Sequence, residues 1–373
     1  MRATRAFEEA VLPTLTALLV ALVAGDLLIL SYGQAPGEVW AMMLRGTWGN
    51  AYGIGQLLYK ATTLTFTGLA VAVGLRAGLF NIGAESQLAA GGFCAALVGL
   101  ALPAAVGPWI AVPLCIVAAA IGGGLVGLVP GVLRARFGAH EVIATIMLNF
   151  VVLAFLNWAM ASGGLAVPET LHTTAAPHAA VPRLASVFAA FHGSAANFVI
   201  VLAILVAALT GWFLFRTRYG FELRAVGLQP AAAENGGIRV ARTWLMAMIV
   251  SGALAGMGGT NFVLGYKSYY EDGFAGGAGF LGIAVALVGR NHPLGVVLAA
   301  LFFATLSQGG LAIHALVPKQ MVEVLEGVVI LAVAMSVPEV RRLLRARPRD
   351  PSPPAPVTSG AANTSAAPAL ADG

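Results

Sequence analysis

The sequence predicts an all-α polytopic membrane protein with about ten transmembrane helices. Hydrophobic residues make up 59% of the 373 residues and charged residues only 10%, and the mean hydropathy is +0.86. Soluble domains carry roughly 25% charged residues, so a soluble fold of this length does not need so much apolar side-chain surface. Apolar runs of about 20 residues, the length that crosses a bilayer as a helix, also recur along the whole chain.

Nine of these runs are long enough to span a membrane, and a tenth, at 278–290, is short. The sequence leaves open whether the tenth run spans the membrane or re-enters it. The nine long runs are 11–31, 56–76, 88–107, 109–133, 141–161, 197–216, 243–265, 294–314 and 321–338.

The distribution of basic residues predicts the orientation. If residues 1–10 are cytoplasmic and ten segments cross, sixteen of the 21 Lys and Arg residues fall on the cytoplasmic side, as the positive-inside rule requires. Both termini are then cytoplasmic, and residues 11–340 form the transmembrane domain. The tail 346–373 is rich in Pro, Ala, Ser and Thr, a composition that predicts disorder.

Several function classes are disfavoured by the sequence. The basic residues are divided among short segments between apolar runs, so lipid and not nucleic acid is the expected contact. The chain has no P-loop and no nucleophile elbow, so neither ATP hydrolysis nor serine hydrolysis is predicted. His172, His178 and His192 share one loop without a zinc spacing, so neither a metal nor a cofactor is predicted.

The most informative stretch runs from Gly78 to Gln87, between two apolar runs. It places Asn81, Glu85 and Gln87 at or just inside membrane depth, where irregular backbone is tolerated only if it is buried or lines a cavity. A second glycine-rich stretch, 273–280, precedes the short tenth run. Interrupted segments in both halves of a chain are typical of a transport pathway between inverted repeats, although glycine-mediated helix packing is the structural alternative.

The charges around these two stretches predict where they lie. Arg76 marks the cytoplasmic end of the preceding run, so Gly78–Gln87 is expected at the inner end of the pathway or folding back from there. The stretch around Gly279 is expected toward the outer side. Lys319, Glu323 and Glu326 share one helix face and form either a local ion pair or a polar wall of the pathway.

Two outer segments have apolar residues at helical spacing and are expected to lie as short helices on the membrane surface. The outer loop 162–195 is the expected dock for an external partner. The apolar positions are Trp40, Met43, Leu44 and Trp48 in segment 36–50, and Leu184, Val187, Phe188 and Phe191 in the loop.

The longest inner loop covers residues 216–242. Its alanines are bounded by Pro230 and Gly236, which predicts a short helix parallel to the membrane. We interpret this helix as a docking element for a cytoplasmic motor, with a solvated basic loop as the alternative.

Four segments together carry a resemblance to a known family: Gly78–Gln87, 140–149, 224–238 and 279–295. In their order and spacing the chain resembles the permease subunits of bacterial ABC importers. Within the branched-chain amino acid and ribose-type permease family, it is most similar to the branch that serves nucleosides and simple sugars. The resemblance covers roughly residues 10–340. It departs at Ser86, Gln229 and Leu281, where the family has Gly, Asn and Asp.

The resemblance implies a type II-like importer fold with an inverted repeat, in the bacterial cytoplasmic (inner) membrane. It implies a non-catalytic subunit working with a second permease in a heterodimer, a separate ABC ATPase, and a periplasmic or lipoprotein substrate-binding protein. The residues expected to line or brace the pathway are Asn81, Glu85, Gln87, Asn149 and Gly279. The residues expected in the ATPase coupling loop are Arg224, Gly227, Asn235, Gly236 and Ile238.

The sequence leaves three alternative functions open. A related permease for branched-chain amino acids would share every motif above. An ion-coupled secondary transporter is disfavoured because no predicted span carries a relay of ionisable groups through its centre. A membrane-embedded enzyme is disfavoured because the sequence has no recognisable catalytic set.

Overall fold

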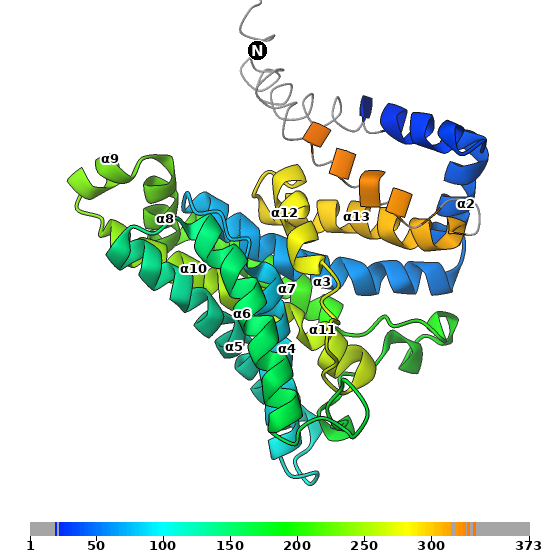
Figure 1. The fold of residues 1–373 in the computed structure, drawn as a ribbon, viewed down its shortest axis with the longest axis horizontal. Helices are drawn as coiled ribbons and strands as arrows, with labels where there is room; N and C mark the ends of the chain where they lie inside the picture. The colour runs from blue at the N-terminus through cyan, green and yellow to red at the C-terminus, as the bar shows by residue number, and fades with distance from the viewer. Residues whose placement is uncertain are drawn as a thin grey trace, which may run out of the picture.

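The computed structural model describes residues 19–314 except Ala21, and ten further residues between positions 318 and 332. Figure 1 shows a bundle of helices with α8 and α9 at one end and α2 at the other. The predicted cytoplasmic segment 1–10, the disordered tail 346–373, and Lys319 and Glu326 lie outside the described residues.

The all-α membrane class is confirmed: the described residues form helices, with three isolated β-bridges and no strand among them. Within the described part of the chain, seven helices are long and apolar enough to span a membrane. The predicted count of about ten remains a prediction. The seven are α3 (Ala51–Arg76), α4 (Ala84–Ala101), α5 (Pro108–Phe137), α6 (Glu141–Ser162), α7 (Val199–Arg216), the continuous Val240–Lys267 and α13 (Pro293–Ile313), and the shorter apolar helices are Leu22–Ser31 and α12 (Ala278–Val288).

Local signals in the sequence explain where these helices begin and end. The Asn50 side chain accepts a hydrogen bond from the Gly53 amide at 2.6 Å and so caps α3. Pro108 and Pro293 occupy the first positions of α5 and α13, where a missing amide proton costs nothing. Gly138 ends α5 with a φ of 65°, a left-handed conformation that glycine adopts without a Cβ clash.

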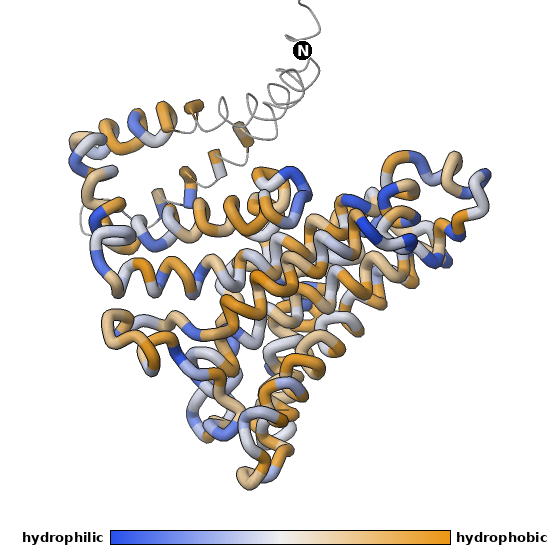
Figure 2. Tube along the Cα trace, turned by 180° about the vertical axis from the view of Figure 1, so that it is seen from behind, coloured by the Kyte–Doolittle hydropathy of each residue, from blue (hydrophilic) through white to orange (hydrophobic). Residues whose placement is uncertain are grey.

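Burial separates inner helices from outer ones. In their most apolar stretches, 78% of α3 and 72% of α4 are buried, against 22% of α6. Figure 2 shows apolar residues along the helix shafts and hydrophilic residues gathered around α8 and α9. The exposed face of α6 is therefore a lipid-facing surface, and its large apolar residues are Ile143, Met147, Phe150, Val151, Phe155 and Trp158.

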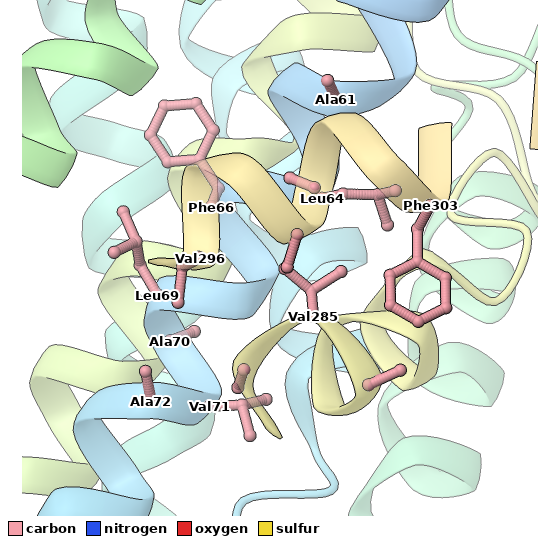
Figure 3. Packing of buried hydrophobic residues seen from close by; sticks show 14 of the residues in the cluster. Ala61, Leu64, Phe66, Leu69, Ala70, Val71, Ala72, Val285, Val296 and Phe303 are labelled. Carbon is pink, nitrogen blue, oxygen red and sulfur yellow. The ribbon is translucent and has the colours of Figure 1, made fainter. Parts of the chain in front are cut away.

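The central core lies where α3 packs against α12 and α13 (Figure 3). A Cβ on Gly68 would approach Val285 of α12 to 2.6 Å and Val296 of α13 to 2.9 Å. Glycine is required there because both helices rest directly on the α3 backbone. Phe66 and Phe303 fill the remaining space and are fully buried.

Small residues also join α5 to α10 (Val240–Gly258), which continues through α11 (Thr260–Phe262) and the π-helical turn η4 (Val263–Lys267). A Cβ on Gly123 would collide with the Gly252 carbonyl oxygen, and a Cβ on Gly256 with the Ala119 carbonyl oxygen. Close backbone approach of this kind maximises van der Waals contact between helices in lipid, where hydrophobic burial gives little drive.

The short run at 278–290 is a half-length helix. The 11 residues of α12 rise about 16 Å at 1.5 Å per residue, roughly half of the 30 Å hydrocarbon core. Gly282 packs on Thr67 in the second half of α3, and the helix ends near Arg76, whose Nε donates to the Asn291 carbonyl oxygen at 3.0 Å. The helix α12 by itself therefore covers only about half of the hydrocarbon core.

The two predicted surface helices have different outcomes. Segment 36–50 contains α2 (Pro36–Trp48), whose buried Met43 packs against Gly309 of α13. The helix expected from Leu184 to Phe191 is wrong: two 3-10 turns, η2 (Leu184–Ser186) and η3 (Ala189–Phe191), flank an extended Phe188. Because the Leu184 amide bonds to the Ala196 carbonyl at 2.8 Å, tertiary pairing outweighs the helical spacing.

The close contact between α5 and α10 at Gly123, Gly252 and Gly256 leads to a testable prediction. Gly123→Ala should destabilise the folded protein by about 1–3 kcal/mol, because the new methyl group meets fixed backbone. Gly124→Ala is the matched control, since its Cβ would lie 3.5 Å from the nearest atom. Melting of the detergent-solubilised protein should show a lower Tm for Gly123→Ala alone. Equal Tm values for the two variants would show that the backbones of α5 and α10 do not touch at Gly123.

Candidate functional site

The predicted polar stretch is a buried hydrogen-bond network. Asn81 and Gln87 are both 0% exposed. The Asn81 amide nitrogen donates to Gln87 Oε1 and to Ser251 Oγ of α10, each at 2.8 Å. Ser251 Oγ in turn donates to the Ala70 carbonyl oxygen at 2.6 Å. The Asn81 side chain therefore joins α4 to α10 directly, and Ser251 extends the connection to α3. The Asn81 amide is fully engaged within the protein.

Side chains of α6 satisfy the irregular backbone that precedes α4. Asn149 Nδ2 donates to the Ile82 carbonyl oxygen at 3.0 Å, and Asn149 Oδ1 accepts from the Ser86 amide at 3.2 Å. Thr145 Oγ1 accepts from the Ile82 amide at 3.3 Å. The first amides of a helix lack internal partners, so Asn149 allows α4 to begin inside the protein.

Glu85 connects the beginnings of two helices. Its Oε1 accepts from the Gly277 amide at 2.8 Å and its Oε2 from the Gly279 amide at 2.7 Å. A Cβ on Gly279 would collide with the backbone of Glu85, so the starts of α4 and α12 touch. Both helix N-termini carry partial positive charge, and the carboxylate between them offsets it.

This contact corrects one expectation about the two glycine-rich stretches. Gly78–Gln87 was expected at the inner end or folding back from there, and Gly279 toward the outer side, but Gly279 and Glu85 are neighbours. The chain folds back after α3 at the α8 end and after η4 at the opposite end, and the two returning segments meet within the bundle. The turns after α3 and after η4 lie at opposite ends of the bundle, as an inverted repeat requires. The first residues of α4 and α12, in contrast, lie next to each other.

A cavity of about 660 Å³ lies beside this meeting point. Asn81, Glu85, Gln87, Asn149 and Gly279 are all buried, and none of them is among its lining residues. Glu323, one of the three residues of the expected polar wall, does line it. The predicted stretch 273–280 contributes Phe274 and Phe280 to the lining. Among the residues that the sequence did not single out, Tyr59, Lys60, Thr63, Phe262 and Ser307 line the cavity.

One signal in the sequence pointed to this cavity. Lys60 lies within an apolar run, where an ionisable side chain is unfavourable and normally faces a polar cavity or partner. It lies in the third turn of α3, and its Nζ donates to Ser307 Oγ of α13 at 3.2 Å. The aromatic residues gave no such signal, because Phe and Tyr are common in any spanning helix.

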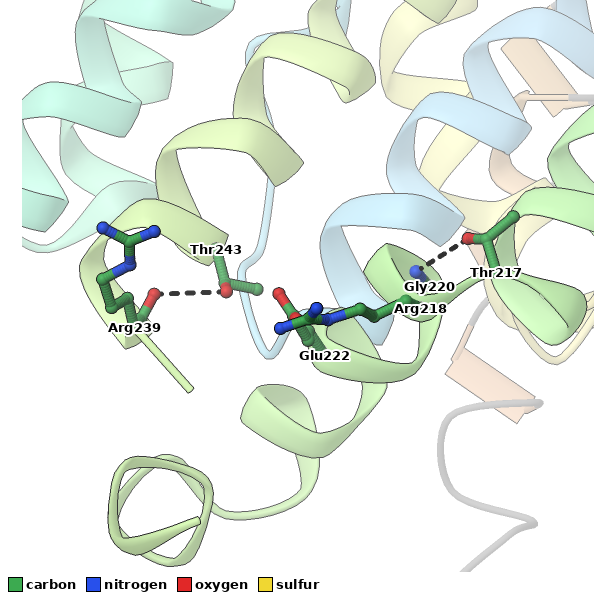
Figure 4. A network of polar contacts seen from close by, with 6 residues as sticks. All are labelled: Thr217, Arg218, Gly220, Glu222, Arg239 and Thr243. Atoms are coloured by element: carbon green, nitrogen blue, oxygen red, sulfur yellow. Dashed lines mark hydrogen bonds and ion pairs between the residues drawn. The ribbon is translucent and has the colours of Figure 1, made fainter. Parts of the chain in front are cut away.

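The short helix predicted between Pro230 and Gly236 is confirmed, and a second helix precedes it. The helix α8 (Arg218–Leu228) is followed by α9 (Pro230–Asn235). Thr217 Oγ1 accepts from the Gly220 amide at 3.1 Å and caps α8, and Arg218 pairs with Glu222 at 2.9 Å (Figure 4). These two contacts are local and stabilise the first turns of α8.

The inner face of α8 rests on the turn that follows α3. A Cβ on Gly227 would collide with the Arg76 carbonyl oxygen, and one on Gly78 would approach the Gly227 Cα to 3.2 Å. Arg224 and Arg76 both lie over the Phe215 ring, at 5.3 and 5.5 Å from its centroid, which adds cation–π attraction. Displacement of α8 would therefore act on the turn only three residues before Asn81.

The face of α8 and α9 that points away from the helix bundle forms a groove of about 510 Å³. Arg224, Gly236 and Ile238 line it, whereas Asn235 is exposed nearby and Gly227 faces the bundle. Leu228 and Phe221, which also line the groove, are 87% and 59% exposed. Exposed apolar side chains gathered in one groove are typical of a protein-binding surface.

Comparison with known proteins identifies the class of this chain. Residues 53–334 match the family described as the branched-chain amino acid transport system permease component, and the chain belongs to that family. It is thus a multi-pass membrane permease, a subunit of an ABC transport system.

Individual relatives cover most of the chain. It is 36% identical over 327 residues to a guanosine ABC transporter permease of Bacillus subtilis, covering 86% of this chain and 92% of that one. It is 32% identical over 339 residues to a nucleoside ABC transporter permease of Lactococcus lactis, covering 87% and 91%. A glucose ABC transporter permease of Haloferax volcanii is 32% identical over 336 residues, covering 86% and 85%.

The Glu85 contact makes a second prediction. Glu85→Gln should lower stability by about 1–3 kcal/mol, because the new amide group cannot accept one of the two backbone hydrogen bonds. Glu222→Gln is the control, since its pairing with the exposed Arg218 contributes at most about 1 kcal/mol. Thermal melting of both variants in detergent measures the difference. A Glu85→Gln protein as stable as Glu222→Gln would show that the carboxylate does not hold the two helix starts together.

Proposed function

We propose that this chain is the membrane-spanning permease subunit of an ATP-driven importer that moves nucleosides into the cytoplasm. The observation that carries the substrate class is its similarity, over most of both chains, to permeases named for guanosine and nucleosides. The chain itself catalyses no reaction, and a separate ATPase subunit hydrolyses ATP.

The proposed orientation places α8 and α9 in the cytoplasm, where the groove lined by Leu228 receives the ATPase. Closure of the ATPase pushes α8, and Gly227 passes that movement to the Arg76–Gly78 turn on which it rests. Asn81, Gln87 and Asn149 brace the segment that follows, so the start of α4 moves as a unit. Glu85 carries the movement to α12, beside the cavity. The permease then switches between an outward-facing and an inward-facing state. The binding protein on one side and the ATPase on the other both shift the equilibrium between these states.

We assign both termini to the cytoplasmic side of a bacterial inner membrane, with residues 11–340 as the permease domain. The loop 162–195 receives a periplasmic or lipoprotein substrate-binding protein. A second, different permease completes the pathway. A second guanosine permease of Bacillus subtilis, 29% identical over 255 residues, supports this pairing, because two matching permeases occur in one organism.

Simple sugars are the second candidate substrate, favoured by the Haloferax volcanii relative named for glucose. Branched-chain amino acids are supported by the family's description alone. Membership of an ABC permease family weighs against an ion-coupled mechanism.

Uptake by the reconstituted complex tests the substrate class. Proteoliposomes containing the permease pair and the ATPase, with the binding protein outside, should accumulate radiolabelled guanosine or uridine only when ATP is enclosed. Labelled glucose and leucine are the comparison substrates. Accumulation of glucose or leucine without any nucleoside uptake would refute the proposal.

The docking groove makes a separate prediction. Leu228→Asp should reduce co-purification of the ATPase about tenfold or more, because a charge replaces an apolar anchor at the centre of the interface. Leu171→Asp is the control, since Leu171 is 69% exposed but lies in the loop at the opposite end. Full retention of the ATPase by Leu228→Asp would place docking elsewhere.

A further inference from the structure

We propose that the cavity between α3, α12 and α13 is the site where the permease itself holds its substrate, and that this site accepts neutral nucleosides but not nucleotides. The inference rests on the proposed function and extends it to named side chains and to a charge preference.

The size and the walls of the cavity suit a nucleoside. Its volume of about 660 Å³ lies within the roughly 300–1,000 Å³ of small-molecule sites. Phe262 and Phe274 stack with ring centroids 4.8 Å apart, and Tyr59 and Phe280 add two more rings to the lining. Aromatic faces stack on nucleobases whatever the base, whereas a sugar without a base has no flat ring to place there.

Two polar groups, Lys60 and Ser307, also line the cavity. Lys60 Nζ donates to Ser307 Oγ at 3.2 Å, which joins α3 to α13 across the lining. An ammonium group offers three donors and a hydroxyl both donates and accepts, so the pair can bond ribose hydroxyls and base carbonyl oxygens. A few placed polar groups in an otherwise apolar pocket fix the orientation of a ligand.

The charge arrangement disfavours a phosphate. Helix N-termini bind phosphate through free amides, and α12 begins at this cavity. Its Gly277 and Gly279 amides are already bonded to Glu85, so they are not available to an anion. Glu323 brings a carboxylate to the lining, and Lys60 is the only cation among the described lining residues. A phosphate would therefore find the Gly277 and Gly279 amides occupied and would be repelled by Glu323.

Phe280 offers the cleanest test of this site. It lines the cavity and is 46% exposed, so Phe280→Leu removes an aromatic face with little loss of internal packing. Phe150→Leu is the matched control, because Phe150 is 68% exposed on the lipid-facing side of α6. At saturating loaded binding protein, Phe280→Leu should slow nucleoside uptake about fivefold or more, the low end of what one base–aromatic stack contributes.

Photolabelling locates the ligand directly. The permease–ATPase complex in nanodiscs, without binding protein, is irradiated with 8-azidoguanosine, and the labelled peptides are identified by mass spectrometry. The expected label falls on peptides containing Tyr59 or residues 262–281. Excess guanosine should abolish it, whereas excess guanosine monophosphate should leave it unchanged. Ser307→Ala should weaken it about threefold or more, the loss expected for one hydrogen bond.

The outcomes separate this inference from the proposed function. If the wild-type complex neither transports nor binds nucleosides, the proposed function fails and this inference fails with it. If the wild-type complex transports nucleosides but the label falls outside the cavity, or Phe280→Leu matches Phe150→Leu, the cavity is not the site. Competition by the monophosphate as strong as by guanosine would overturn the charge preference.

Discussion

The structure depends on a single carboxylate between two helix starts. Two helices that begin within an apolar bundle leave amides without partners, and in lipid no water is available to satisfy them. Glu85 bonds both the Gly277 and Gly279 amides of α12 while it occupies the first turn of α4. Without this group, two positive helix ends would face each other in a medium of low dielectric constant.

The same arrangement creates the space that a transport subunit needs. Because α12 covers only the second half of α3, it leaves space beside Tyr59, Lys60 and Thr63 in the first half. The cavity occupies that position, with aromatic residues of the returning segment on one side and α13 on another. A full-length helix there would fill the space.

A chain of direct contacts connects α8, at one end of the bundle, to α12 beside this cavity. Gly227 touches the turn after α3, Asn81 joins that turn to α10, and Glu85 joins α4 to α12. Each connection is a direct backbone contact or a buried hydrogen bond, so the elements can shift together as packed units. The exposed groove at one end and the cavity within the bundle thereby belong to one connected structure.

The sequence by itself determined the membrane class, the position of most helices and the polar stretch, because apolar run length and an isolated Asn–Glu–Gln cluster are local signals. Tertiary structure decided how that cluster is used. Asn81 and Glu85 stood out as pathway residues, yet their atoms bond Ser251 and Gly279, far away along the chain. The stretch 273–280 was expected beside the pathway and supplies part of the cavity lining. Its pairing with Tyr59, Lys60 and Ser307 could not be predicted, because it arises only where α12 stops halfway along α3.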